Sequence, residues 1–99
     1  MPSAPPQVII SLAEDHGTLL TSRFLGADLR EQVEQLAVTQ PVIVDLAGVE
    51  MTSPSFADEF FAKLGPLMDA DRVKIVNAAP DIESIIGTVT AGRHRPPTS

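Results

Sequence analysis

Two hydroxyl side chains, Ser53 and Ser55, flank a proline that follows a short apolar run ending near Asp45. Serine is a preferred N-cap residue, and proline suits the first helical position because its missing N–H would be unpaired there. The pattern therefore predicts that a helix begins at Ser53 or Ser55. Free N–H groups and the helix dipole favour negative charge at such a start, so a phosphate on Ser55 would be stabilised. We predict Ser53 as the structural cap and Ser55 as the candidate phosphorylation site.

Carboxylates lie on both sides of this helix start. Asp45 ends a predicted strand, where it could act as an acceptor or metal ligand, or accept hydrogen bonds from backbone N–H groups of the next loop; the second role is the expected one. Asp58 and Glu59 fall in the first turn, where they favour the dipole, and the face opposite the phenylalanines is free for contacts. The candidate partner-binding residues are Asp45, Gly48, Ser53, Ser55, Asp58 and Glu59.

The elements that must position these residues alternate between strands and helices. Residues 42–46 are apolar and β-branched, which is typical of a central strand covered by helices on both faces, and residues 73–76 predict a parallel neighbour. Residues 25–38 and the segment that begins at Pro80 have helical spacing. The stripe of the middle helix is Phe56, Phe60, Leu64 and Leu67, widened by Phe61 and Met68.

Two further expectations concern that middle helix. Gly65 and Pro66 should end or kink it near Leu64, because proline removes a backbone donor and disfavours helical geometry in its predecessor. Adjacent residues point about 100° apart on an α-helix, so Phe60 should be central. Phe61 is then either a second core residue or an exposed partner contact.

The ends of the chain complete the predicted architecture. Residues 7–12 form a strand, residues 14–17 a turn and residues 18–23 a second strand that pairs back as an antiparallel hairpin. The order is β-β-α-β-α-β-α, a small α/β domain over residues 7–91 with a mainly parallel sheet and three helices. Proline-rich residues 1–6 and residues 92–99 are predicted to be disordered tails.

The segments Val44-Asp45-Leu46-Ala47-Gly48-Val49 and Phe56-Ala57-Asp58-Glu59-Phe60 resemble the STAS-like domain family, a relative of the STAS domains of bacterial anti-sigma factor antagonists. The resemblance covers roughly residues 17–89 and implies the same α/β order. It also implies a signalling role in transcription regulation, in which the chain docks on a protein partner such as a histidine-kinase-like ATPase or an anti-sigma factor. The serine that these antagonists have phosphorylated corresponds to Ser55. No enzyme activity is implied.

Composition excludes several other functions. A net charge of −6 argues against binding nucleic acid or anionic membranes, since both attract cationic surfaces. The chain has no cysteine, no signal-peptide pattern and no apolar run that could span a bilayer, so we expect a cytoplasmic protein. His16 and His94 are isolated, and no Gly-rich phosphate loop is present. We therefore expect no metal and no cofactor.

Three alternatives to the phosphorylated switch are open. A receiver-like domain would be phosphorylated on Asp45, with Glu14, Asp15 and Lys74 completing its site. A small hydrolase would use Ser55 or Ser53 as nucleophile, but the sequence places no base beside them. A constitutive interaction module would use the same surface with no phosphorylation.

Overall fold

Three parallel strands form the main sheet, and the strand predicted to be central is central. The computed structural model describes residues 7–94. The sheet consists of β1 (Val8–Ser11), β3 (Val42–Asp45) and β5 (Val73–Val76) in the order β1-β3-β5, with both pairs parallel. Val44, in β3, is fully buried. The α/β class and the mainly parallel sheet are therefore confirmed.

The predicted N-terminal hairpin is wrong. After β1 the chain forms a short helix, α1 (Leu12–His16), and Gly17, at φ +89°, leads into β2 (Leu19–Leu20). β2 pairs in parallel with β4 (Met51–Thr52), not with β1. A hairpin needs a tight turn between its strands, whereas a helix fills the predicted turn and carries the chain away from β1. Among residues 7–94, both sheets are purely parallel and α1 adds a helix to the three predicted.

The first long helix, α2 (Arg23–Ala37), matches the predicted element within two residues at each end. The Ser22 hydroxyl accepts a hydrogen bond from the Leu25 N–H (3.2 Å) and caps its start. Its buried residues recur at helical spacing: Gly26, Leu29, Val33 and Ala37. At the other end the Arg72 guanidinium donates to the Ala37 carbonyl (2.6 Å from Nη2), which pairs an oxygen that the helix itself leaves free.

The middle helix does not end near Leu64. It runs without interruption through α3 (Pro54–Ala57), the π-helical turn η1 (Asp58–Ala62) and α4 (Lys63–Asp69), and Pro66 lies inside α4. In a regular α-helix the ring of Pro66 would collide with the carbonyl of Ala62, which is the last residue of η1. The helix is therefore already irregular where the proline needs room, and it continues past the proline.

The same π turn buries both neighbouring phenylalanines. A π turn bonds each N–H to a carbonyl five residues back, so it holds more residues per turn and adjacent side chains point less far apart. Phe60 and Phe61 are both fully buried, with ring centroids 5.2 Å apart at an edge-on angle. Phe56 stacks on Phe60 at 5.3 Å. The predicted core stripe is confirmed, and an exposed Phe61 is excluded.

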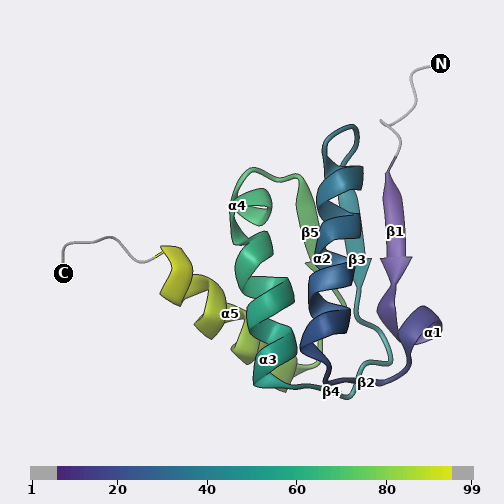
Figure 1. Ribbon diagram of the computed structural model, residues 1–99, viewed down its shortest axis with the longest axis vertical. Coiled ribbons are helices and arrows are strands. Elements are labelled where there is room, and N and C mark those ends of the chain that lie inside the picture. The colour runs from purple at the N-terminus through teal and green to yellow at the C-terminus, as the bar shows by residue number, and fades with distance from the viewer. Residues whose placement is uncertain (1–6, 95–99) are drawn as a thin grey trace.

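The last helix, α5 (Pro80–His94), is longer than predicted, because residues 92–94 continue it. The predicted tails at residues 1–6 and 95–99 lie outside the described residues. Ile82 is buried, and Figure 1 shows α5 packed beside the middle helix. None of the helices within residues 7–94 combines the length and the apolar character that crossing a membrane requires.

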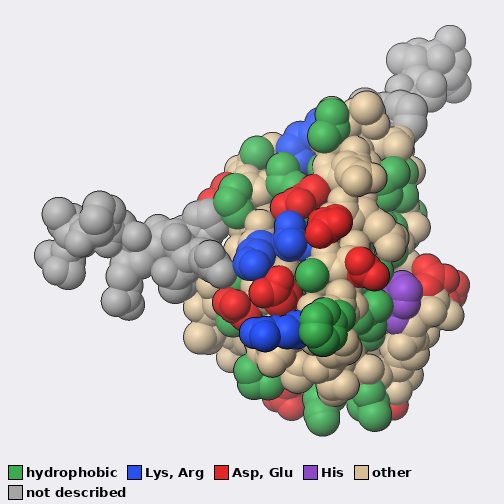
Figure 2. All heavy atoms as spheres, in the orientation of Figure 1, with side chains coloured by type: hydrophobic (Ala, Val, Ile, Leu, Met, Phe, Trp, Pro, Cys, Tyr) green, Lys and Arg blue, Asp and Glu red, His purple; other side chains and the backbone are tan. Residues whose placement is uncertain are grey.

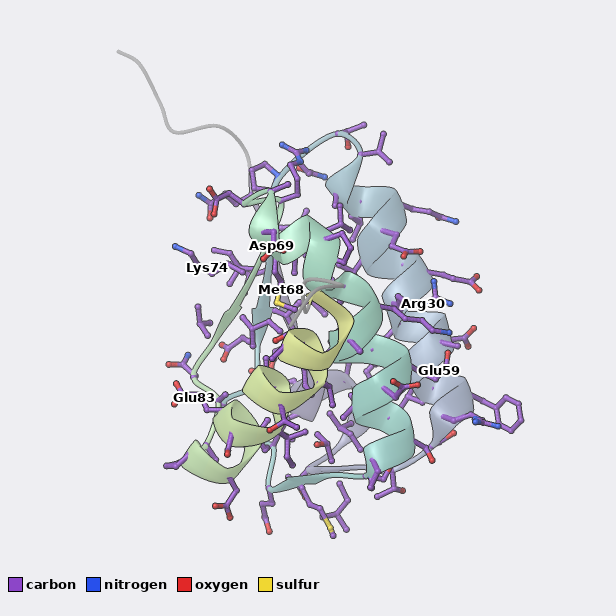
Figure 3. The ribbon with its side chains drawn as sticks, turned by 90° about the vertical axis from the view of Figure 1, so that its left-hand side faces the viewer. Arg30, Glu59, Met68, Asp69, Lys74 and Glu83 are labelled. Carbon is purple, nitrogen blue, oxygen red and sulfur yellow. The ribbon has the colours of Figure 1, made fainter. Side chains whose placement is uncertain are left out.

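The helices cover one face of the main sheet, and the expectation of helices on both faces is wrong for the described residues. Figure 1 shows α2 and α4 on the same side of the strands. Figure 3 shows Lys74 pointing away from them on the other side, and Ile9, paired with Ile43 on the neighbouring strand, is 65% exposed. Burial accordingly alternates along β3, with Val42 and Val44 inward and Ile43 half-buried.

Candidate functional site

The start of the middle helix lies at the carboxyl ends of the strands, where loops of parallel sheets usually meet partners or ligands. Ser53 is the N-cap: its Oγ accepts a hydrogen bond from the Phe56 N–H (3.0 Å). The same hydroxyl donates to the Thr21 carbonyl (2.9 Å) in the segment that leads into α2. Ser53 is therefore the structural cap, as predicted, and its hydroxyl both accepts and donates a hydrogen bond.

Ser55 has the opposite environment. It is exposed in the first turn, directly after the exposed Pro54, and its hydroxyl has no hydrogen-bond partner among residues 7–94. The helix that follows is continuous to Asp69, so the dipole of a long helix acts at this position. A group added to Ser55 would enter solvent without breaking the cap.

Asp45 joins the ends of two strands. Its Oδ1 accepts hydrogen bonds from the Ala47 N–H (2.9 Å) and from the Asn77 side-chain amide (3.0 Å). The amide of Asn77, and then the backbone N–H of Ala47, hold the pKa of Asp45 below its ordinary value of 3.8, because both stabilise the charged form. Asn77 itself adopts φ +60°, a conformation that asparagine tolerates. The predicted backbone hydrogen bond is confirmed, and Asn77 is an added partner.

The receiver-like alternative requires a group of carboxylates around Asp45. Within residues 7–94, no three His, Cys, Asp or Glu side chains come close enough to hold a metal ion, so Glu14 and Asp15 do not complete such a group. Lys74 pairs with Ile43 in the middle of the sheet and projects from its open face (Figure 3). The geometry around Asp45 is that of a clamp between β3 and β5.

Gly48 shapes the loop between these strands and the helix start. Its φ of +88° is a left-handed conformation that favours glycine, and a Cβ there would lie 3.2 Å from the Cβ of Ala13. The loop is thus held close to α1. Gly48 positions the site through its backbone.

Asp58 and Glu59 begin the π turn with different surroundings. Glu59 forms an ion pair with Lys63 (3.1 Å), and its carboxylate side chain is only 19% exposed. Its Cβ lies 3.2 Å from where a Cβ on Gly26 would be, so this side chain lies between α2 and the middle helix. Asp58 is exposed. Figure 2 shows oppositely charged side chains interleaved across one face of the molecule. On α2, Arg30 and Glu34 form a second ion pair (3.0 Å).

One surface feature was not predicted from the sequence. Leu19 and Met51 are paired in register on the small β2–β4 sheet and are 57% and 50% exposed. Thr52, which leads into the Ser53 cap, is buried instead. An exposed apolar pair therefore precedes the helix start that carries Ser55. Strands of two residues show no periodicity, so the sequence carries no signal for this pairing.

Comparison with protein families gives one match. The model of a STAS-like domain of unknown function matches residues 26–83, which include β3, the Gly48 loop, the middle helix and β5. No curated protein and no solved structure matches the chain.

Proposed function

The chain belongs to the family of STAS-like domains, and from that premise we propose that it is a protein-interaction switch controlled by phosphorylation of Ser55. The partner would be a histidine-kinase-like ATPase or an anti-sigma factor, by analogy with the anti-sigma factor antagonists that the chain resembles. The protein would act in the cytoplasm of a bacterium, where ATP is available to the kinase. Binding and release require no catalytic step by this chain, so no enzyme activity is assigned.

The difference between the two serines carries the proposal. The Ser53 hydroxyl accepts a hydrogen bond from the Phe56 N–H and donates one to the Thr21 carbonyl, whereas the Ser55 hydroxyl is exposed and has no partner among the described residues. Modification of Ser53 would break the cap, while modification of Ser55 would leave it whole. The helix start can therefore carry a phosphate and keep its fold.

The phosphate would weaken binding to the partner without changing the fold. It adds a charge of about −1.5 to −2 at neutral pH and must remain hydrated. The helix start favours that charge in the free protein, but a partner surface packed against Pro54 and Ser55 would have to desolvate it. Exposed apolar side chains such as Leu19 and Met51 supply area for such a contact. Phosphorylation would thus favour the free state.

The proposal is tested by phosphorylation of the purified protein with ATP and the histidine-kinase-like ATPase encoded nearest to it. We expect mass spectrometry to find one phosphate, on Ser55, and none on Ser55→Ala. Calorimetry should then show at least tenfold weaker binding to the same ATPase for the phosphorylated protein and for Ser55→Asp, which is a loss of about 1.4 kcal/mol. Ser55→Ala should bind like the wild type with or without ATP.

Two outcomes would contradict the switch. A phosphate found on another residue would remove Ser55 from its role. Equal binding of the wild type, its phosphorylated form and Ser55→Asp would leave a constitutive interaction module with no phosphorylation control. Thermal unfolding of Ser55→Asp serves as the control, because aspartate suits the first turn and should change stability little.

A further inference from the structure

A groove of about 500 Å³ runs between the start of the middle helix and α5. Its walls come from β4, from α3 and from one face of α5, where lining residues recur three and four positions apart. The lining residues are Thr52, Pro54, Ala57, Asp81, Ser84, Ile85, Thr88 and Val89. Ser55 is not among them, so the groove and the phosphorylation candidate occupy different sides of the same helix start.

One of these residues has an unmet hydrogen-bonding requirement. Thr52 is only 5% exposed, and its Oγ1 has no hydrogen-bond partner among the described residues. An unpaired buried hydroxyl costs about 1–3 kcal/mol, so native proteins usually satisfy such groups. Thr52 contributes to the wall of the groove, but its Oγ1 is covered and does not face solvent.

The charge of the groove indicates what charge its ligand should carry. Asp81 is the one ionisable residue in the lining, and no lysine or arginine of the described chain lines the groove. The protein as a whole carries a net charge of −6. Pro54, Ile85 and Val89 form the apolar part of the wall. A ligand that fits has a long aliphatic stem and a cationic end with several donors.

We propose that this groove receives an arginine side chain of the partner protein, with the guanidinium at Asp81 and the methylene stem along Pro54 and Ile85. Arginine fits better than lysine because its planar guanidinium has five donors, enough for a carboxylate and neighbouring hydroxyl groups together. Its stem packs on apolar surface while the charged end stays near water. This inference rests on the proposed role as an interaction module and does not depend on phosphorylation of Ser55.

The test is an NMR titration of the full-length ¹⁵N-labelled protein with two capped tripeptides. One is leucine-arginine-leucine, and the other carries citrulline, a neutral side chain of nearly the same shape, in place of arginine. We expect the arginine peptide to shift the amide signals of Thr52, Ala57, Ser84 and Thr88, and the citrulline peptide to bind at least fivefold more weakly. Asp81→Asn should abolish this preference, while the control Asp28→Asn, exposed on α2, should retain it.

A second variant controls for the wall of the groove. Thr52→Val removes the covered, unpaired hydroxyl at nearly constant shape, so the protein should be at least as stable as the wild type and should bind the arginine peptide equally well. The inference is overturned if the groove signals do not shift up to the solubility limit, if arginine and citrulline peptides bind equally, or if the preference survives Asp81→Asn. A lysine peptide that binds as tightly as the arginine peptide overturns the assignment to arginine.

The two proposals fail in different ways. The tripeptides need neither a kinase nor a modified serine, so their failure leaves the Ser55 experiment unaffected. Conversely, groove binding that is the same in Ser55→Asp and wild type, together with no effect of that variant on the ATPase, would retain the docking groove and remove the switch.

Discussion

Successive turns of the middle helix differ in how deeply they are buried and therefore in how much they contribute to stability. At the helix start, the Ser53 hydroxyl caps the helix and bonds to the Thr21 carbonyl, while Pro54 and Ser55 are exposed. The next turn, η1, buries Phe60 and Phe61 completely and distorts the helix to do so. Changes to the buried turn should therefore alter stability, and changes to the exposed start should alter contacts. The predictions below test this contrast, beginning with the largest effect.

Truncation of Phe60 in the buried turn should have the largest effect. Phe60→Ala removes a ring that packs on both Phe56 and Phe61, and we expect a loss of about 3–5 kcal/mol in the free energy of unfolding. Urea denaturation followed by circular dichroism measures it. Phe24→Ala is the matched control, since that ring is 80% exposed and its loss should stay within about 0.5 kcal/mol. Equal losses for the two variants would show that the core is misplaced.

A glycine pair tests how closely the buried turn is packed. In Gly26→Ala the new Cβ would lie 3.2 Å from the Phe56 carbonyl and from the Cβ of Glu59. The carbonyl belongs to a buried backbone that yields little, so the crowding should outweigh the helix propensity of alanine and cost on the order of 1–2 kcal/mol. Gly87→Ala meets nothing within 4 Å and should instead gain about 0.5–1 kcal/mol. A gain in both variants would mean that the two helices can move apart freely.

Local chemistry explains which parts of the fold the sequence predicts. The Ser53 cap, the central strand and the phenylalanine stripe follow from residue types within a few positions, and all three are confirmed. The continuation past Pro66 was missed because the adjustment occurs upstream, in a π turn that has no simple sequence rule. The predicted N-terminal hairpin is wrong because β2 pairs with β4, more than 30 residues away.

The same reasoning separates the site residues. Asp45 was expected to accept a hydrogen bond from the next loop, which is a local contact, and it does so at Ala47. Its second donor, Asn77, lies 32 residues away and becomes a neighbour only when β3 and β5 pair. The groove beside Asp81 likewise needs α5 to pack against α3, which periodicity alone does not specify. Contacts between residues that are far apart in the sequence account for most of what the sequence did not predict.

The two serines provide the most direct comparison at the exposed start. Ser53→Ala should cost about 1 kcal/mol, because the Phe56 N–H loses its cap and the Thr21 carbonyl loses a donor. Ser55→Ala should change the unfolding free energy by less than about 0.5 kcal/mol, since its hydroxyl bonds to no described residue. Thermal and urea unfolding of both variants provide the measurement. A larger loss for Ser55→Ala would reverse the roles assigned to the two hydroxyls.

The smallest effect should depend on pH and be lost in acid, at the clamp that joins β3 to β5. The pKa of Asp45 is lowered in the folded state by Asn77 and Ala47, so the folded protein holds the charged form more tightly than the unfolded chain does. This contribution to stability is present above the ordinary pKa of 3.8 and is lost as the pH falls through the lower folded value. Asp45→Asn removes the titrating group, and the difference in urea midpoint between wild type and variant should therefore shrink as the pH is lowered from about 6 to below that range. Other carboxylates titrate in the same range, so the comparison is repeated with Asp28→Asn, whose side chain takes no part in the clamp. A wild-type advantage over Asp45→Asn that stays constant from pH 6 into acid would mean that the bonds from Asn77 and Ala47 do not favour the charged carboxylate, and the clamp would then rest on geometry alone.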